Sequence, residues 1–221
     1  MAADGPVRGP ARPAGGAGRA ASARSRHRAE TRRRIVDAGA RAFGRYGFHG
    51  AKIAAVAREA GVANGTFYLH FKDKDELFHE VARAATLALA ARLRAIEAQD
   101  LDPTTSERRE LEAIVDFAAE HGDLMRAGLA RALHGSRASM TAMELLVRQR
   151  AAALARGIER GVVSPCIDPE VAARADFGML TAVLEWWSSR GGAVSRERLV
   201  ETLSALRRGG LGLPAAREGL R

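Results

Sequence analysis

The sequence contains a single cysteine among its 221 residues, and aromatic residues make up only 5% of it. One cysteine cannot form an intramolecular disulfide, and it excludes the multi-cysteine zinc and iron–sulfur sites. Alanine is the commonest residue, so we expect an aliphatic interior that is compatible with helices. No run approaches the roughly 18 uninterrupted apolar residues of a membrane span, and the N-terminal arginines precede no apolar segment of a secretory signal. We therefore expect a cytoplasmic protein with no cofactor, no bound metal and no membrane partner.

Positive charge is concentrated at one end of the chain. Of the net charge of +9, residues 1–34 carry +7, because nine arginines there face only Asp4 and Glu30. A basic arm on a nearly neutral body favours a polyanionic partner, most often a nucleic acid. A solvated tail that only maintains solubility is the alternative explanation of the same charge.

The periodicity of apolar residues predicts an all-α fold. No run of alternating β-branched residues is long enough for a strand, and apolar residues recur at helical spacing through most of the chain after residue 29. The first 28 residues contain almost no large apolar side chain, so they are expected to be disordered. The predicted helices cover residues 30–44, 53–60, 64–71, 73–98, 106–121, 123–134, 139–161, 168–190 and 195–208.

Residues 43–77 contain the pattern of a helix-turn-helix unit. Two short amphipathic helices are separated by Gly61-Val62-Ala63, a turn of the usual length for this motif, and the glycine permits the left-handed backbone of a sharp helix exit. The apolar residues expected to face inward are Ile53, Val56, Ala57, Ala60, Val62, Phe67 and Phe71. The outer face of the second helix carries no carboxylate and begins at a helix N-terminus, which suits a helix lying in the major groove beside phosphates.

This segment resembles the DNA-binding domain of the tetracycline-repressor (TetR) family of bacterial regulators. The matching residues cover about 45 positions in three successive stretches. They are Ile53-x-x-Val56-Ala57-x-x-Ala60-Gly61-Val62, Gly65-Thr66-Phe67-Tyr68-x-His70-Phe71 and Lys74-Asp75-Glu76-Leu77. The resemblance implies an N-terminal three-helix DNA-binding domain followed by a C-terminal helical bundle for ligand binding and dimerisation. The corresponding divisions are a basic arm (1–28), the helix-turn-helix domain (29–75) and the C-terminal domain (76–221).

The resemblance also implies roles for individual residues. The residues that would face bases or the groove wall are Asn64, Thr66, Tyr68 and Leu69. The residues that would meet phosphate are Lys52, His70 and Lys74, together with Arg32 and Arg33 of the basic segment. Family members often have threonine where this chain has Lys52, and a capping serine where it has Ala63; Asn64 can take over the cap, which would hold its side chain away from the bases. Each position also has a structural alternative: Thr66 can solvate a helix start, Tyr68 can be half-buried core, and His70 can be a hydrogen-bonded structural histidine.

In the C-terminal half, the predicted helix 168–190 is unusual because residues 177–184 are apolar on nearly every side. A helix that is apolar all round must be buried all round. One side can face its own core, and the other is expected to face a second subunit, as the family resemblance also implies. The predicted dimer interface comprises Ala175, Gly178, Met179, Ala182, Trp186, Leu199 and Leu203. A central helix buried within a monomer is the alternative.

The resemblance implies a cavity for a small molecule among the middle helices. The candidate lining residues are Met125, Met143 and Phe177, since methionine tolerates irregular cavities. The apolar positions of these helices include no cationic side chain, which favours a largely apolar effector.

Together these observations predict a ligand-responsive, DNA-binding transcriptional regulator. The specific hypothesis is a homodimeric repressor, associated with the bacterial nucleoid, that an effector releases from a palindromic operator in double-stranded DNA. A non-specific architectural protein that coats nucleic acid through its arginine arm is the alternative. A helical enzyme is disfavoured because the sequence contains no paired carboxylates or histidines at the spacing of an acid–base or di-metal site.

Overall fold

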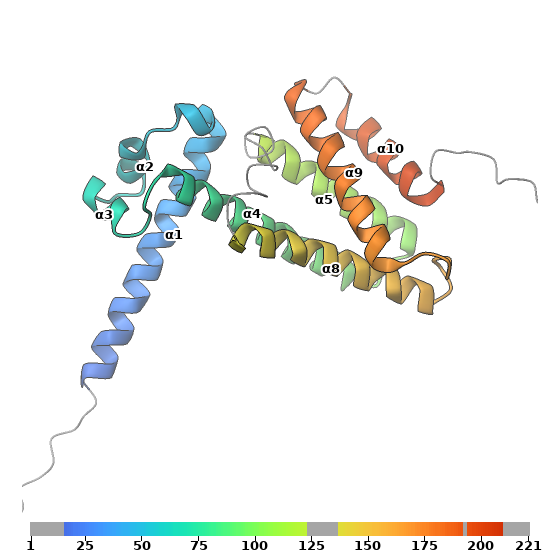
Figure 1. The fold of residues 1–221 in the computed structure, drawn as a ribbon, viewed down its shortest axis with the longest axis horizontal. Helices are drawn as coiled ribbons and strands as arrows, with labels where there is room; N and C mark the ends of the chain where they lie inside the picture. Colours follow the sequence, from blue (N-terminus) through green and yellow to red (C-terminus); the bar gives the residue numbers. More distant parts are fainter. Residues whose placement is uncertain (1–15, 123–136, 192–193, 210–221) are drawn as a thin grey trace, which may run out of the picture.

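The computed structural model describes residues 16–122, 137–191 and 194–209, and every regular element within these ranges is an α-helix (Figure 1). The predicted all-α fold is confirmed. The helices are α1 (Gly16–Gly50), α2 (Ile53–Glu59), α3 (Asn64–Tyr68), α4 (Lys74–Glu97), α5 (Pro103–Glu120), α8 (Arg137–Glu159), α9 (Pro169–Ser189) and α10 (Arg196–Gly209). The helix predicted at 123–134 lies outside the described residues.

Helix α1 is longer than the sequence predicted. It begins at Gly16, so the interpretation of residues 16–28 as disordered is wrong; residues 1–15 lie outside the described part. Alanine and arginine make up most of this stretch and are good helix formers, and extending an existing helix avoids the cost of nucleation. Figure 1 shows this half of α1 projecting beyond α2 and α3 and away from the remaining helices. The helix is broken at Gly47, where φ is +67°.

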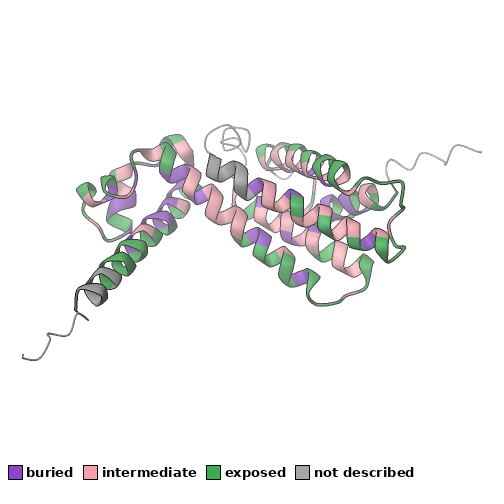
Figure 2. Ribbon diagram, turned by 60° about the horizontal axis from the view of Figure 1, so that its bottom comes forward, coloured by how far each residue is buried: buried purple, intermediate pink, exposed green. Residues whose placement is uncertain are grey.

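The first three helices and the start of α4 enclose one hydrophobic core (Figure 2). Its largest side chains are fully buried: Phe43, Phe67, Phe71 and Leu77 are each at most 1% exposed. The ring of Phe43 meets that of Phe78 edge-on at 5.4 Å, a favoured aromatic geometry. The apolar residues predicted to face inward therefore hold the short helices α2 and α3 against α1.

Helix α4 links the two halves of the molecule (Figure 1). Its N-terminus is capped by Asp73, whose carboxylate accepts a hydrogen bond of 2.8 Å from the backbone N–H of Glu76. Leu77 and Val81 belong to the first core, whereas Leu89 and Leu93, farther along the helix, line a cavity in the C-terminal half. At 24 residues the helix is about 36 Å long.

A second core lies among α5, α9 and α10 and includes Leu111, Val115 and Leu184. Leu199 and Leu203 of α10 belong to it and are 4% and 1% exposed. The prediction that these two leucines face a second subunit is therefore wrong. The apolar face of α10 packs inward against its own α5, which the sequence pattern of one helix cannot distinguish from a subunit interface.

Candidate nucleic-acid interface and cavity

The turn between α2 and α3 is fixed by a contact that the sequence did not reveal. Gly61 has φ of +66°, and a Cβ at this position would lie 2.7 Å from Nη2 of Arg34. That guanidinium, on α1, donates hydrogen bonds to the carbonyl oxygens of Ala60 and Gly61, the latter at 3.0 Å. Arg34 thus fastens the turn to α1. No local pattern could predict these hydrogen bonds, because Arg34 is 26 and 27 residues away in the sequence from Ala60 and Gly61.

Helix α3 presents a neutral, exposed outer face. Tyr68 and Leu69 are 53% and 72% exposed, whereas Phe67 between them and the core is completely buried. The edge contact of Tyr68 with the Phe67 ring, at 5.3 Å between centroids, leaves most of the tyrosine in solvent. The alternative interpretation, in which Tyr68 is half-buried core, is therefore wrong. Thr66 is only partly exposed, on the first full turn of the same helix.

The start of α3 has no side-chain cap. Ala63 is the N-cap residue, with extended backbone, and no side chain accepts a hydrogen bond there. Asn64 is the first residue of the helix and is exposed, so the prediction that it can replace the missing serine as the cap is wrong. Its side chain is consequently exposed at the start of α3 and makes no cap hydrogen bond to the backbone.

His70 is half-buried below α3. Burial is the main cause that lowers the pKa of its imidazole, and the nearby positive charges of Arg28 and Arg32 lower it further. A lowered pKa keeps the ring neutral at pH 7, so His70 offers a hydrogen bond rather than a positive charge to phosphate. Its buried Nδ1 has no hydrogen-bond partner among the described residues.

Two of the predicted phosphate-binding residues have intramolecular partners. The ammonium of Lys74 donates to the carbonyl oxygen of Ala51 at 3.2 Å and lies 4.6 Å from the centre of the Phe48 ring. The guanidinium of Arg32 lies 4.3 Å above the Phe71 ring and pairs with Glu80 at 3.5 Å. Both side chains therefore join the start of α4 and its flanking segment to α1.

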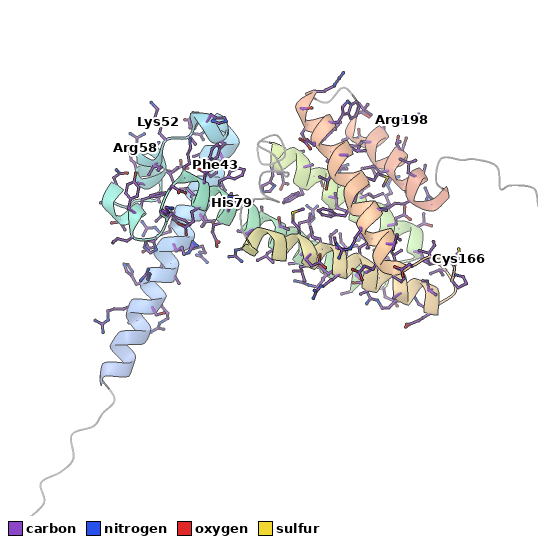
Figure 3. All side chains as sticks on the ribbon, viewed as in Figure 1. Phe43, Lys52, Arg58, His79, Cys166 and Arg198 are labelled. Atoms are coloured by element: carbon purple, nitrogen blue, oxygen red, sulfur yellow. The ribbon has the colours of Figure 1, made fainter. Side chains whose placement is uncertain are left out.

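Lys52 and Arg33 differ from this pair because both are exposed. Lys52 is the N-cap residue of α2 and makes no side-chain cap bond. Figure 3 shows Lys52 at the surface of the helix-turn-helix unit, on the side away from the C-terminal helices. These two cations remain the stronger candidates for phosphate contacts.

The N-terminal half of α1 adds residues that were assigned to a disordered arm. A groove between α1 and α3 is lined by Arg24, His27, Arg28, Thr31, Thr66, Leu69 and His70, with Ala23. Nη2 of Arg28 approaches the carbonyl oxygen of Leu69 at 3.5 Å. Arg24 and Arg28 are four residues apart on one helix and so share a face. The four-residue spacing of these arginines was the sequence signal that they could share a helix face. The prediction missed it because the low apolar content of residues 1–28 had indicated disorder.

The C-terminal half contains a cavity of about 120 Å³ enclosed by α4, α5, α8, α9 and α10. Met143 and Phe177, two of the predicted lining residues, are both part of its wall, whereas Met125 lies outside the described residues. Most of the remaining wall is apolar. Its main apolar members are Leu89, Leu93, Ile114, Phe117, Leu146, Val147, Leu180 and Leu184.

One part of the cavity wall is charged, contrary to the expectation of a wall without cations. Arg207 grips the carboxylate of Asp176 with two hydrogen bonds, from Nε at 2.9 Å and from Nη2 at 2.7 Å. Nε of Arg150 lies 3.1 Å from the same carboxylate, and its Nη1 lies 3.6 Å from Oε2 of Glu110. Burial raises the pKa of Glu110 and lowers that of Arg150. These four residues, from four different helices, are called the charged cluster below.

The exposed side of α9 carries most of the predicted dimer residues. Ala175, Gly178 and Ala182 are exposed, and Trp186 on the following turn is 42% exposed. Val171, one helical turn before Ala175, is 67% exposed and was not among the predicted interface residues. Met179 packs instead against the second core. This stripe of small and apolar side chains, residues 171–186, is called the α9 face below.

The fold and the exposed helix α3 define a helix-turn-helix DNA-binding protein with a separate helical domain. The family model "Bacterial regulatory proteins, tetR family" matches residues 35–81, and the model "Tetracyclin repressor-like, C-terminal domain" matches residues 108–211. The chain belongs to the TetR family of transcriptional regulators. Members of this family bind DNA and small molecules and act as dimers.

Similar proteins include regulators of the same class. An uncharacterised HTH-type transcriptional regulator of Bacillus subtilis, YhgD, is 27% identical over 175 residues, which cover 76% of this chain and 90% of the relative. The fatty acid degradation regulator FadR of Bacillus halodurans has the same fold, with a TM-score of 0.68, 22% identity and coverage of 82% and 96% of the two chains. FadR of Bacillus subtilis, solved with stearoyl-CoA, has a TM-score of 0.61, 20% identity and coverage of 80% and 98%.

Two further observations concern the part of the chain that the structure describes. None of its helices combines the length and the apolar character that crossing a bilayer requires. Within the same ranges, no three His, Cys, Asp or Glu side chains are grouped so that they could hold a metal ion.

Proposed function

We propose that this protein is a homodimeric repressor that binds a palindromic operator and is released from it by a small-molecule effector. The observation that carries the proposal is the exposed outer face of α3. Tyr68 and Leu69 project from a helix whose other side is fixed by the fully buried Phe67. A rigid scaffold beneath exposed side chains is what base recognition in the major groove requires.

The surface around α3 supplies the groups for phosphate. Lys52 and Arg33 are exposed cations on the same domain, and Arg28 lies beside the C-terminal end of α3. Phosphate contacts fix the orientation of a protein on the duplex, and base contacts specify the sequence. We assign base contacts to Asn64, Thr66, Tyr68 and Leu69, and a positioning role to Arg32 and Lys74.

The α9 face supports the dimer. It exposes small residues at Ala175, Gly178 and Ala182, which allow two helices to approach closely, and ends at the half-exposed Trp186. A two-fold pair formed through this face has two copies of α3. Such dimers contact half-sites one helical turn, about 34–36 Å, apart.

Helix α4 offers a direct route from effector to DNA. Its first turns pack in the core beneath α3 through Leu77, and its later turns line the cavity through Leu89 and Leu93. A ligand that displaces the cavity end of this helix therefore moves the helix-turn-helix unit at its other end. In a dimer, such a movement changes the spacing of the two recognition helices, which lowers operator affinity.

Selection of bound fragments from a random pool of double-stranded DNA tests the proposal. A palindromic or near-palindromic motif should be enriched by the full chain. The architectural alternative predicts binding without enrichment of any motif, and that outcome would overturn the proposed function.

A further inference from the structure

The charged cluster lies partly buried in the wall of the cavity, where charge is costly unless it is paired. The side chains of Arg207 and Asp176 are 5% and 12% exposed, and those of Glu110 and Arg150 are 19% and 26% exposed. Nε of Arg150 and Nη1 of Arg207 are buried and make no hydrogen bond of acceptable geometry among the described residues, although each lies near a carboxylate, at 3.1 Å from Asp176 and 3.9 Å from Glu110. Both donors belong to residues that line the cavity. A ligand that brings acceptor oxygens to these guanidinium groups would satisfy them.

The partners already present do not complete this site. Asp176 takes both direct hydrogen bonds of Arg207, whereas Glu110 forms only longer ion pairs, at 3.6 Å from Arg150 and 3.9 Å from Arg207. Two arginines thus share one well-placed carboxylate. When Glu110 is protonated, the charged cluster has a net charge of +1, which one anionic group would balance.

The rest of the cavity limits the body of the ligand. Apart from the charged cluster its wall is mostly aliphatic and aromatic, with leucine the commonest residue, and its volume is about 120 Å³. A cavity of about 150 Å³ lined by such residues holds a benzene molecule. The space beside the charged cluster therefore fits an apolar group of about six carbon atoms.

We propose that the cavity binds a monocarboxylate with an apolar body of about six carbon atoms, whose carboxylate lies against Arg150 and Arg207. The proposal names the chemical class of the effector and so rests on the proposed function. It replaces the sequence-based expectation of a largely apolar effector with an amphipathic acid.

Binding of the acid should be coupled to a proton on Glu110. Desolvation raises the pKa of this carboxyl, and Glu97 and Asp176 raise it further, while Arg150 and Arg207 lower it. A second carboxylate placed beside it raises the pKa again. Between the pKa of Glu110 in the empty cavity and its pKa beside the ligand, binding takes up a proton, so affinity falls as pH rises.

Isothermal titration calorimetry of the full chain without DNA tests this site. The probes are benzoate and hexanoate, with benzamide and hexanamide as uncharged analogues of the same shape. We expect each carboxylate to bind at least ten-fold more tightly than its amide. Equal affinity of acid and amide, or binding of neither acid, would overturn the proposal.

The variant Glu110→Gln separates this site from general damage to the fold, because it should gain affinity. Removing the nearby carboxylate should tighten benzoate binding by about ten-fold at pH 8 and abolish the proton uptake measured in buffers of different ionisation enthalpy. Glu112→Gln is the matched control: Glu112 lies on the same helix, pairs with Arg108 at 3.0 Å and should bind benzoate like the wild type. Unchanged affinity and unchanged proton uptake in Glu110→Gln would contradict the assigned role.

Failure of this inference can be distinguished from failure of the proposed function. A chain that enriches an operator but ignores both acids retains the proposed function and refutes the ligand class. A chain that binds benzoate tightly but enriches no DNA motif supports the ligand class and refutes the proposed function.

Discussion

The cationic side chains of the DNA-binding domain fall into two groups, which differ in whether the side chain has an intramolecular hydrogen bond. Arg34 fastens the turn of the helix-turn-helix unit, and Lys74 joins the start of α4 to the segment after α1. Lys52 and Arg33 are exposed. Substitution of the first group should affect the fold and DNA binding together, whereas substitution of the second should affect DNA binding alone.

Replacing Tyr68 by alanine should weaken specific binding without unfolding the domain. The ring is 53% exposed, so little buried area is lost, but a base or sugar contact contributes about 1–3 kcal/mol of specific affinity. Fluorescence anisotropy with the selected operator and with random DNA measures the effect. Tyr46→Ala is the control, since Tyr46 is 56% exposed at the end of α1. Equal operator affinity of the two variants would contradict the placement of α3 in the groove.

Lys52→Ala and Lys74→Ala should differ in stability. Lys52→Ala should lower the salt slope of DNA binding by about one unit and leave the melting temperature unchanged. Lys74→Ala should also destabilise the domain by about 1 kcal/mol, because the carbonyl oxygen of Ala51 loses its charged donor. Thermal melting beside salt titrations of DNA binding distinguishes the two. A stable Lys74→Ala variant would show that the hydrogen bond contributes nothing to folding.

At the scale of elements, the sequence predicted the helices whose signals are local. The turn at Gly61, the inward residues Phe67 and Phe71, and the start of α4 at residues 73–74 were predicted from apolar spacing and turn chemistry, and they are confirmed. The N-terminal extension of α1 was missed because low apolar content predicted disorder, although alanine and arginine favour helix.

The charged cluster could not have been predicted from the sequence. Glu110, Arg150, Asp176 and Arg207 come from α5, α8, α9 and α10. Pairs between helices leave no periodic pattern in the chain, unlike the pairs of residues three or four apart within one helix. The same reason explains the error at Leu199, because an apolar helix face does not reveal whether its partner is the same subunit or another.

Gly61→Ala should destabilise the helix-turn-helix element by about 1–2 kcal/mol, the cost of a left-handed backbone for a residue with a Cβ. Displacement of Arg34 would add to this cost, since the new Cβ would lie 2.7 Å from its Nη2. Gly44→Ala is the control: Gly44 is within α1, with no atom within 4 Å of a Cβ placed there. That change should stabilise the helix by about 0.5–1 kcal/mol. Chemical denaturation of both variants measures the difference, and equal stabilities would refute the argument.

At the scale of the whole molecule, α1 carries positive charge from the folded domain towards the place where bound DNA should lie. Deleting residues 1–28 removes six arginines, among them Arg24 and Arg28 of the groove beside α3. If about three of the six touch phosphate, the log–log salt slope should fall by nearly three units. The ratio of operator to random-DNA affinity should change much less, because phosphate contacts carry little sequence information.

Two outcomes would contradict this account of the arm. An unchanged salt slope would support the solubility-tail alternative. A collapse in selectivity would mean that the arm itself reads bases or the shape of a groove.

The central claim is that two copies of this chain, joined through the α9 face, place two copies of α3 in the major groove of one operator. Hydroxyl-radical footprinting on the selected operator tests it most directly, with light scattering of the same complex to count the chains of 23.6 kDa. The account predicts two symmetric protected regions about one helical turn apart and two or a multiple of two chains per operator. A single protected half-site occupied by one chain, or uniform protection along the fragment, would contradict it.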